Sequence, residues 1–126
     1  MYFDNLTTVE EIKKVYRDLA LRYHPDMGGD LETMQQLNAE YKDALQRCQG
    51  QKQKKDDGDT VTYNYRESNE QAIIEILDQL IALQMEDVEI FIIGVWVWIL
   101  GDTKPYKEQL KSLKLRWHGK HKAWYY

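Results

Sequence analysis

The chain has 126 residues, 43% of them hydrophobic, and a net charge of −4, a composition that predicts a folded soluble protein and excludes a disordered one. Cys48 is the single cysteine, which excludes an internal disulfide and is typical of a reducing compartment. Residues 1–4 carry no signal-peptide pattern. The longest apolar run, 88–100, contains Glu89 and is too short to cross a bilayer, so we expect a cytoplasmic protein with no membrane contact.

The first predicted element is an amphipathic helix that begins after Thr8 and ends near Tyr23. Thr8 and Glu11 form a capping box, and apolar residues then recur at helical spacing. Pro25 ends this helix, because proline disfavours helical backbone at the residue before it. A turn with two glycines follows, and Asp30 is a suitable N-cap for a second amphipathic helix that reaches residue 48. Two such helices with a short loop predict an antiparallel hairpin.

The polar segment 50–60 contains no large apolar residue and predicts a linker between two domains, residues 1–49 and 61–126. Beyond it, Ser68 and Gln71 form a second capping box for a helix that reaches about residue 85. The runs 88–93 and 95–100 predict two strands around Gly94, either a tight hairpin or one kinked strand. A helix after residue 102 and two short strands, 115–117 and 123–126, complete an α-β-β-α-β-β order. The predicted fold class is therefore α+β.

The loop His24-Pro25-Asp26 suits recognition better than catalysis. No nucleophile, second acid or phosphate-binding loop accompanies it, so we expect neither an enzyme nor a cofactor. Proline fixes the backbone, which presents the histidine and the aspartate rigidly, and an aspartate can accept paired hydrogen bonds from a partner's arginine. On the preceding helix, Lys13 and Arg17 lie one turn apart without acidic neighbours at i, i+4 spacing, which favours contact with a partner.

The segment 12–26, IKKVYRDLALRYHPD, resembles helix II and the loop of a J-domain, and its continuation to Tyr41 resembles the compact J-domains of viral, phage and bacterial proteins. The resemblance covers residues 1–48. It implies a co-chaperone whose loop and basic helix dock on the ATPase domain of a DnaK-type chaperone and stimulate ATP hydrolysis. Asp18 and Met27 depart from the pattern, in which both positions are commonly basic, and the usual fourth helix is missing. The implied chaperone-binding residues are Lys13, Tyr16, Arg17, His24, Pro25 and Asp26. The alternative is a plain helical hairpin whose loop matches by chance.

The last part of the chain is rich in tryptophan and lysine. Residues 102–126 carry 7 Lys and Arg against 2 Asp and Glu, whereas residues 1–101 carry 10 against 19. Trp96 and Trp98 share one face of a predicted strand, where their rings either fill a small core or form an exposed aromatic face. An exposed aromatic face beside basic residues is typical of proteins that bind single-stranded nucleic acid. The candidate residues for nucleic-acid or client binding are Trp96, Trp98, Lys107, Lys111, Lys114, Arg116, Lys120 and Lys122.

Two further patterns complete the prediction. His118 and His121 have no second ligand pair at zinc spacing, so we expect no metal site. The segment 101–126 is similar to a small β-α-β module appended to phage and mobile-element proteins, and this likeness assigns no residue a role. We expect the C-terminal domain to select an unidentified client protein. The alternative function is that of a nucleic-acid-binding accessory protein of a phage or mobile element.

Overall fold

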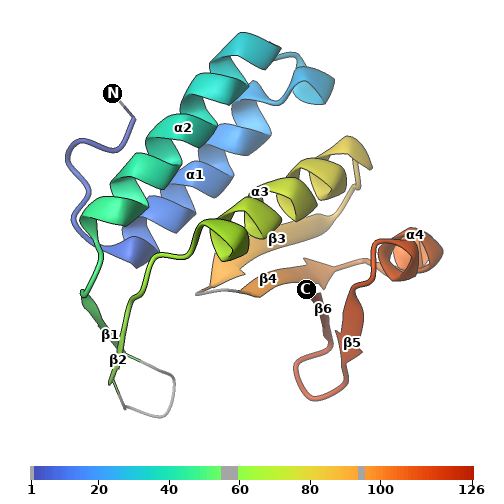
Figure 1. Cartoon of the computed structure of the whole chain (residues 1–126). Helices are drawn as coiled ribbons and strands as arrows, with labels where there is room; N and C mark the ends of the chain where they lie inside the picture. Colours follow the sequence, from blue (N-terminus) through green and yellow to red (C-terminus); the bar gives the residue numbers. More distant parts are fainter. Residues whose placement is uncertain (1, 55–59, 94–95) are drawn as a thin grey trace.

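The computed structural model describes residues 2–54, 60–93 and 96–126 (Figure 1). Its helices are α1 (Val9–Tyr23), α2 (Leu31–Arg47), α3 (Glu67–Ala82) and α4 (Lys107–Ser112), with short 3₁₀ turns η1 (Pro25–Met27) and η2 (Lys104–Tyr106). Its strands are β1 (Lys52–Lys54), β2 (Thr60–Thr62), β3 (Val88–Ile93), β4 (Trp96–Gly101), β5 (Arg116–His118) and β6 (Ala123–Tyr125). This mixture of helices and antiparallel strands confirms the α+β class. Among the described residues, no helix is both long and apolar enough to span a membrane.

Helices α1 and α2 begin at the predicted caps and lie side by side. The Thr8 hydroxyl accepts from the Glu11 N–H (3.2 Å) and donates to the Glu11 carboxylate (2.8 Å). The Asp30 carboxylate accepts from the Thr33 N–H (2.8 Å), and this bond lowers the pKa of Asp30. These local bonds satisfy amide groups that the first turn of a helix leaves without partners.

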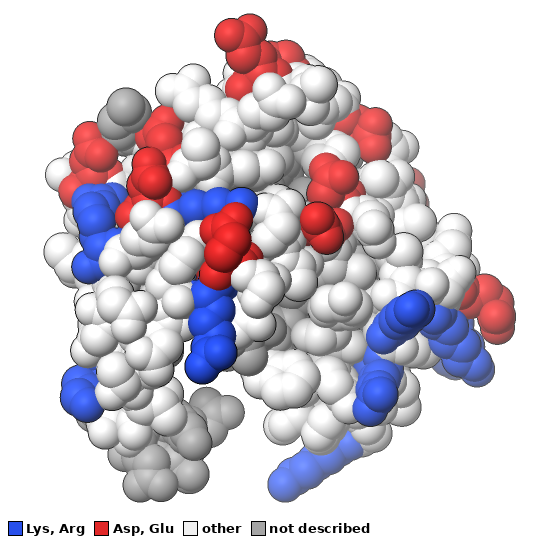
Figure 2. All heavy atoms as spheres, in the orientation of Figure 1, with Lys and Arg blue, Asp and Glu red and all other residues white. Residues whose placement is uncertain are grey.

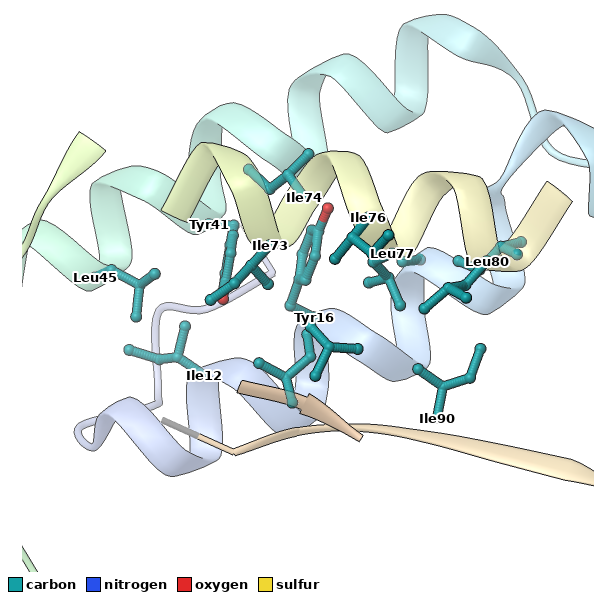
Figure 3. Packing of buried hydrophobic residues seen from close by; sticks show 14 of the residues in the cluster. Ile12, Tyr16, Tyr41, Leu45, Ile73, Ile74, Ile76, Leu77, Leu80 and Ile90 are labelled. Carbon is teal, nitrogen blue, oxygen red and sulfur yellow. The ribbon is translucent and has the colours of Figure 1, made fainter. Parts of the chain in front are cut away.

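The apolar stripes of α1 and α2 meet in a shared core. Figure 3 shows Tyr16 and Tyr41 beside each other, and their rings stack with centroids 3.9 Å apart. The Tyr16 hydroxyl donates to Asn38 Oδ1 of α2 (2.6 Å). The core continues through buried side chains of α3, β3 and β4 as one hydrophobic cluster, which includes Leu77 and Ile90. The helical pair is therefore packed against the second half of the chain.

The four-stranded sheet has the order β3-β4-β6-β5, and each neighbouring pair is antiparallel. Strands β3 and β4 pair from Val88↔Gly101 to Ile93↔Trp96, which is the hairpin rather than the kinked strand of the two predicted forms; Gly94 lies outside the described residues. Helix α3 lies along β3 and β4 in Figure 1. Since alternate residues of β4, Val97 among them, are buried, one face of the sheet belongs to the core.

One local expectation is wrong. Ser68 and Gln71 do not cap α3, which begins at Glu67, and its N-cap Arg66 makes no side-chain capping bond. The segment predicted as a linker carries paired strands, with Lys52 opposite Thr62 in the β1–β2 ladder, while residues 55–59 lie outside the described residues. The division into domains at residues 49 and 61 stays a prediction.

Candidate partner-binding site

The loop after α1 is tightly bonded within itself. His24 Nδ1 accepts from the Asp26 N–H (3.1 Å), and the His24 carbonyl accepts from the Gly29 N–H (3.0 Å). A Cβ at Gly29 would lie 1.9 Å from the Tyr23 carbonyl oxygen, so only glycine fits there. The loop geometry is therefore fixed by its own backbone and by one glycine.

His24 is held against α3 instead of facing solvent. Its side chain is buried, with a relative exposure of the residue of 4%, and its Nε2 lies 2.6 Å from Asp78 Oδ1. Since Nδ1 accepts from the Asp26 amide, Nε2 is the nitrogen that donates to Asp78. His24 is therefore not presented to a partner as predicted, whereas Pro25 and Asp26 are exposed.

Lys13 also faces inward. Its ammonium lies 2.9 Å from Glu70 Oε2 of α3, and both side chains are buried. Burial lowers the pKa of Lys13, and the nearby Glu70 charge opposes this shift. The Tyr63 hydroxyl donates to the second Glu70 oxygen (2.9 Å). The acidic partner of Lys13 therefore lies 57 residues further along the chain, on another helix.

The other two predicted residues of α1 differ in exposure. Tyr16 is buried. Burial is the main cause that raises the pKa of its hydroxyl, and the negative charge of Asp78 adds to it. Arg17 is partly exposed, with its guanidinium carbon 5.2 Å from the ring centroid of Phe91 in β3. Its Nη2 also lies 3.2 Å from a carboxylate oxygen of Asp18, the next residue in the chain. The structure thus places Lys13 and His24 at two separate points of the contact with α3, whereas Tyr16 is buried against α2.

A cleft lies beside the loop, between the helical pair and α3. Its volume is about 460 Å³, and the residues that line it include His24, Pro25, Asp26, Met34 and Asp78. The loop therefore borders open space even though His24 itself is bonded to α3.

Sequence reasoning missed the acidic residues of α3 that hold α1. Glu70 lies three residues before Ile73 and seven before Leu77, so it occupies the apolar stripe of α3. A charged residue within such a stripe is the signal for a buried ion pair. Asp78 lies on the exposed part of the helix and carries no such signal.

The outer face of the sheet is aromatic. Trp96 and Trp98 alternate with the buried residues of β4, so they lie on the face opposite the core, and Trp96 is 49% exposed. The Trp98 ring centroid lies 5.3 Å from Tyr125, 5.7 Å from His118 and 5.6 Å from His121. These five residues are called the aromatic face below.

The other two tryptophans lie side by side on β5 and β6, with ring centroids 5.6 Å apart. Trp124 is buried, whereas Trp117 is 51% exposed. Among the four tryptophans, Trp124 is therefore the one that fills the core, and the other three are at least partly exposed. Within the described residues, no group of three or more His, Cys, Asp and Glu side chains could hold a metal ion.

The predicted basic residues divide between two places. Arg116 pairs with Tyr125, which pairs with Trp98, so Arg116 shares the aromatic face, and Lys120 and Lys122 lie in the adjoining β5–β6 turn. The second group comprises Lys107 and Lys111 on α4 and Lys114, which lines a hollow beside α3. Figure 2 shows basic side chains over α4 and the β5–β6 hairpin, with acidic ones gathered over the helices above.

Comparison with known proteins finds two viral relatives of a short stretch of the chain. The small t antigen and the large T antigen of budgerigar fledgling disease virus are each 58% identical over 31 residues, which is 25% of this chain. The matched stretch covers 21% of the small t antigen and 5% of the large T antigen. No family model matches the chain. No solved structure matches it.

Proposed function

We propose that the chain is a J-domain co-chaperone that stimulates the ATPase of a DnaK-type chaperone through α1 and the His24-Pro25-Asp26 loop. The observation that carries this proposal is the loop itself. It follows a helix with Lys13 and Arg17, its backbone is locked by internal bonds, and it places Asp26 in solvent. An exposed carboxylate on a rigid loop is suited to an arginine of a partner.

The similarity to viral proteins supports the proposal of a J-domain. The segment 12–26 resembles helix II and the loop of a J-domain, its continuation to Tyr41 resembles the compact J-domains of viral, phage and bacterial proteins, and both matched relatives are viral. The C-terminal half, with its own sheet, would select the client protein. The inward positions of Lys13 and His24 add one requirement: a chaperone that uses them must displace α3.

A single-turnover ATPase assay tests this function. We expect the full chain to stimulate a DnaK-type chaperone, and His24→Gln to abolish the effect. Asp26→Asn is a cleaner variant, because Asp26 is exposed and its loss spares the His24–Asp78 contact. We expect it to raise the concentration for half-maximal stimulation about tenfold or more, since a hydrogen bond to a charged group is worth about 1.5–3 kcal/mol.

The control for this assay is His121→Gln, which changes an exposed histidine in the β5–β6 turn, away from α1. It should leave the stimulation unchanged. Stimulation that survives His24→Gln would refute the role of the loop.

We also propose a second candidate function, binding of single-stranded nucleic acid on the aromatic face. Trp96 and Trp98 point away from the core, and Arg116 lies on the same face. Stacking of a base on an aromatic side chain is worth about 1–3 kcal/mol, and basic residues beside the stack bind the phosphates. The aromatic face thus offers both elements of such a site.

Titration with a single-stranded oligonucleotide, followed by tryptophan fluorescence at several salt concentrations, tests this second function. We expect quenching that weakens with salt, and an affinity about tenfold lower for Trp96→Ala, in line with one lost stack of about 1–3 kcal/mol. The matched charge variants are Arg116→Gln with Lys122→Gln near the aromatic face, and Lys107→Gln with Lys111→Gln on α4. Loss of binding in the α4 pair alone would place the site elsewhere.

A further inference from the structure

The segment 70–84 contacts the proposed chaperone-binding site at two places, one on α1 and one at the loop that follows it. On α3, Glu70 binds Lys13 (2.9 Å) and Asp78 binds His24 (2.6 Å). Just after α3, the Gln84 side-chain amide donates to the Asp26 carbonyl (2.7 Å). Segment 70–84 therefore occupies the hydrogen-bonding groups at both the basic and the loop end of α1.

The chemistry of this contact matches that of the proposed partner site. A chaperone surface that binds Lys13 and a histidine N–H must supply acidic or carbonyl acceptors. Glu70 and Asp78 are acceptors of this kind, and they already occupy the same donors. His24 Nε2 carries a single N–H, and the Lys13 ammonium is buried against Glu70, so the chaperone cannot reach these donors while α3 holds them.

We propose that α3 is an autoinhibitory element that competes with the chaperone for α1 and the loop. This inference rests on the proposed co-chaperone function, whose site it regulates. The closed state is the chain in which α3 contacts His24. Displacement of α3 from His24 produces the active state. The protein is then a co-chaperone whose activity depends on the release of an internal contact.

The two ends of the contact between α1 and α3 differ in burial, so one end separates more easily than the other. The Lys13–Glu70 pair is buried on both sides, and breaking it leaves a buried charge without a partner. In contrast, the Asp78 side chain is 62% exposed and Gln84 is exposed. The cleft beside the loop lies at this second end. Opening therefore starts at His24, where a partner can reach the exposed Pro25 first.

The rest of α3 limits how far the opening goes. Ile73, Leu77 and Ile81 are buried in the hydrophobic cluster. Complete removal of α3 would expose all of this apolar surface to water, which costs free energy. A shift of only the last turns of α3 avoids this cost. The inhibited step is therefore the release of His24 and the Asp26 carbonyl from Asp78 and Gln84.

The experiment uses the full chain with Asp78→Ala combined with Gln84→Asn. Asp78→Ala removes the carboxylate, and asparagine tolerates the positive φ of 51° at residue 84 while being too short to keep the bond to Asp26. Glu75→Ala is the control, because it removes a charge from α3 at a side chain that is bonded to Gln71 of the same helix.

Two readouts are measured on each variant. Modification of histidines by diethyl pyrocarbonate, read by mass spectrometry, reports exposure of His24, with the exposed His121 as internal reference. The single-turnover ATPase assay reports stimulation of the chaperone. We expect the double variant to raise both the His24 modification rate and the potency of stimulation by about fivefold or more, the lower range of allosteric couplings, and Glu75→Ala to change neither.

The outcomes separate this inference from the proposed function. If His24 reacts as fast in the unchanged chain as in the double variant, the contact with α3 does not protect it and the inference fails. Equal stimulation by the two chains, with a higher His24 reactivity in the double variant, also overturns autoinhibition but leaves the co-chaperone function standing. If His24 becomes reactive and no chain stimulates the chaperone, the co-chaperone function itself fails, and autoinhibition fails with it.

Discussion

At the residue scale, Glu70 connects the two halves of the chain. One of its oxygens accepts from Lys13 and the other from Tyr63, and all three side chains are buried. Tyr41 lies close enough for the charge of Glu70 to add to the effect of burial in raising its pKa, but no hydrogen bond of good geometry joins them. Among the described residues, the Tyr41 hydroxyl is the buried side-chain group without a partner.

This difference predicts unequal effects on stability for two similar substitutions. Tyr63→Phe leaves a buried Glu70 oxygen without its donor, and we expect a loss of about 1–3 kcal/mol of unfolding free energy. Tyr41→Phe removes a hydroxyl that has no bond, and we expect no loss, or a gain of up to about 1 kcal/mol. Urea denaturation midpoints measure both. A loss above about 1 kcal/mol in Tyr41→Phe would show that its hydroxyl is bonded in solution.

At the scale of elements, the turn from α1 to α2 depends on close backbone packing. Pro25 ends α1, the η1 turn follows, and Gly29 passes against the Tyr23 carbonyl. This arrangement sets the angle at which the two helices return along each other, and it also places Asp26 in solvent. One glycine therefore affects both the helical pair and the loop.

The substitution Gly29→Ala tests this role. The added methyl group would meet the Tyr23 carbonyl, so we expect a destabilisation of about 1–3 kcal/mol, the usual cost of overpacking, together with weaker chaperone stimulation. Thermal or urea unfolding measures the first effect. Gly119→Ala is the matched control, because a methyl group there meets no atom within 4 Å. Equal stabilities of the two variants would argue against a tight loop.

At the scale of the whole molecule, the hydrophobic core is continuous. Buried residues of α1 and α2 join those of α3, β3 and β4 in one cluster, and the Lys13–Glu70 pair crosses the same boundary. Neither half alone has more than about 70 residues, a size at which a single core supplies only a few kcal/mol. The shared core is the physical reason to expect that the halves depend on each other.

We therefore expect one cooperative unfolding transition. Tryptophan fluorescence reports only the C-terminal half, because all four tryptophans lie between residues 96 and 124. Far-ultraviolet circular dichroism reports mainly α1, α2 and α3. The two signals should give the same urea midpoint. Two separate midpoints would instead support independent domains, as the segment 50–60 predicts.

The sequence by itself determined the features that depend on near neighbours. Capping by Thr8 and Asp30, the end of α1 at Pro25 and the alternation along β4 follow from bonds and periodicities within a few residues, and the structure confirms them. The wrong cap at Ser68 belongs to the same scale, since the N-cap of α3 is Arg66, two residues earlier, and it makes no side-chain capping bond.

Only the tertiary structure decided which face of each element is covered. The pairing of Lys13 with Glu70 and of His24 with Asp78 joins residues more than fifty positions apart, and the outward direction of Trp96 depends on which side of the sheet meets α3. Sequence periodicity shows that a stripe exists, but the stripe's partner is set by packing between elements distant in the chain. For this reason the sequence was enough to identify the His24-Pro25-Asp26 loop, whereas the contact between His24 and Asp78 required the structure.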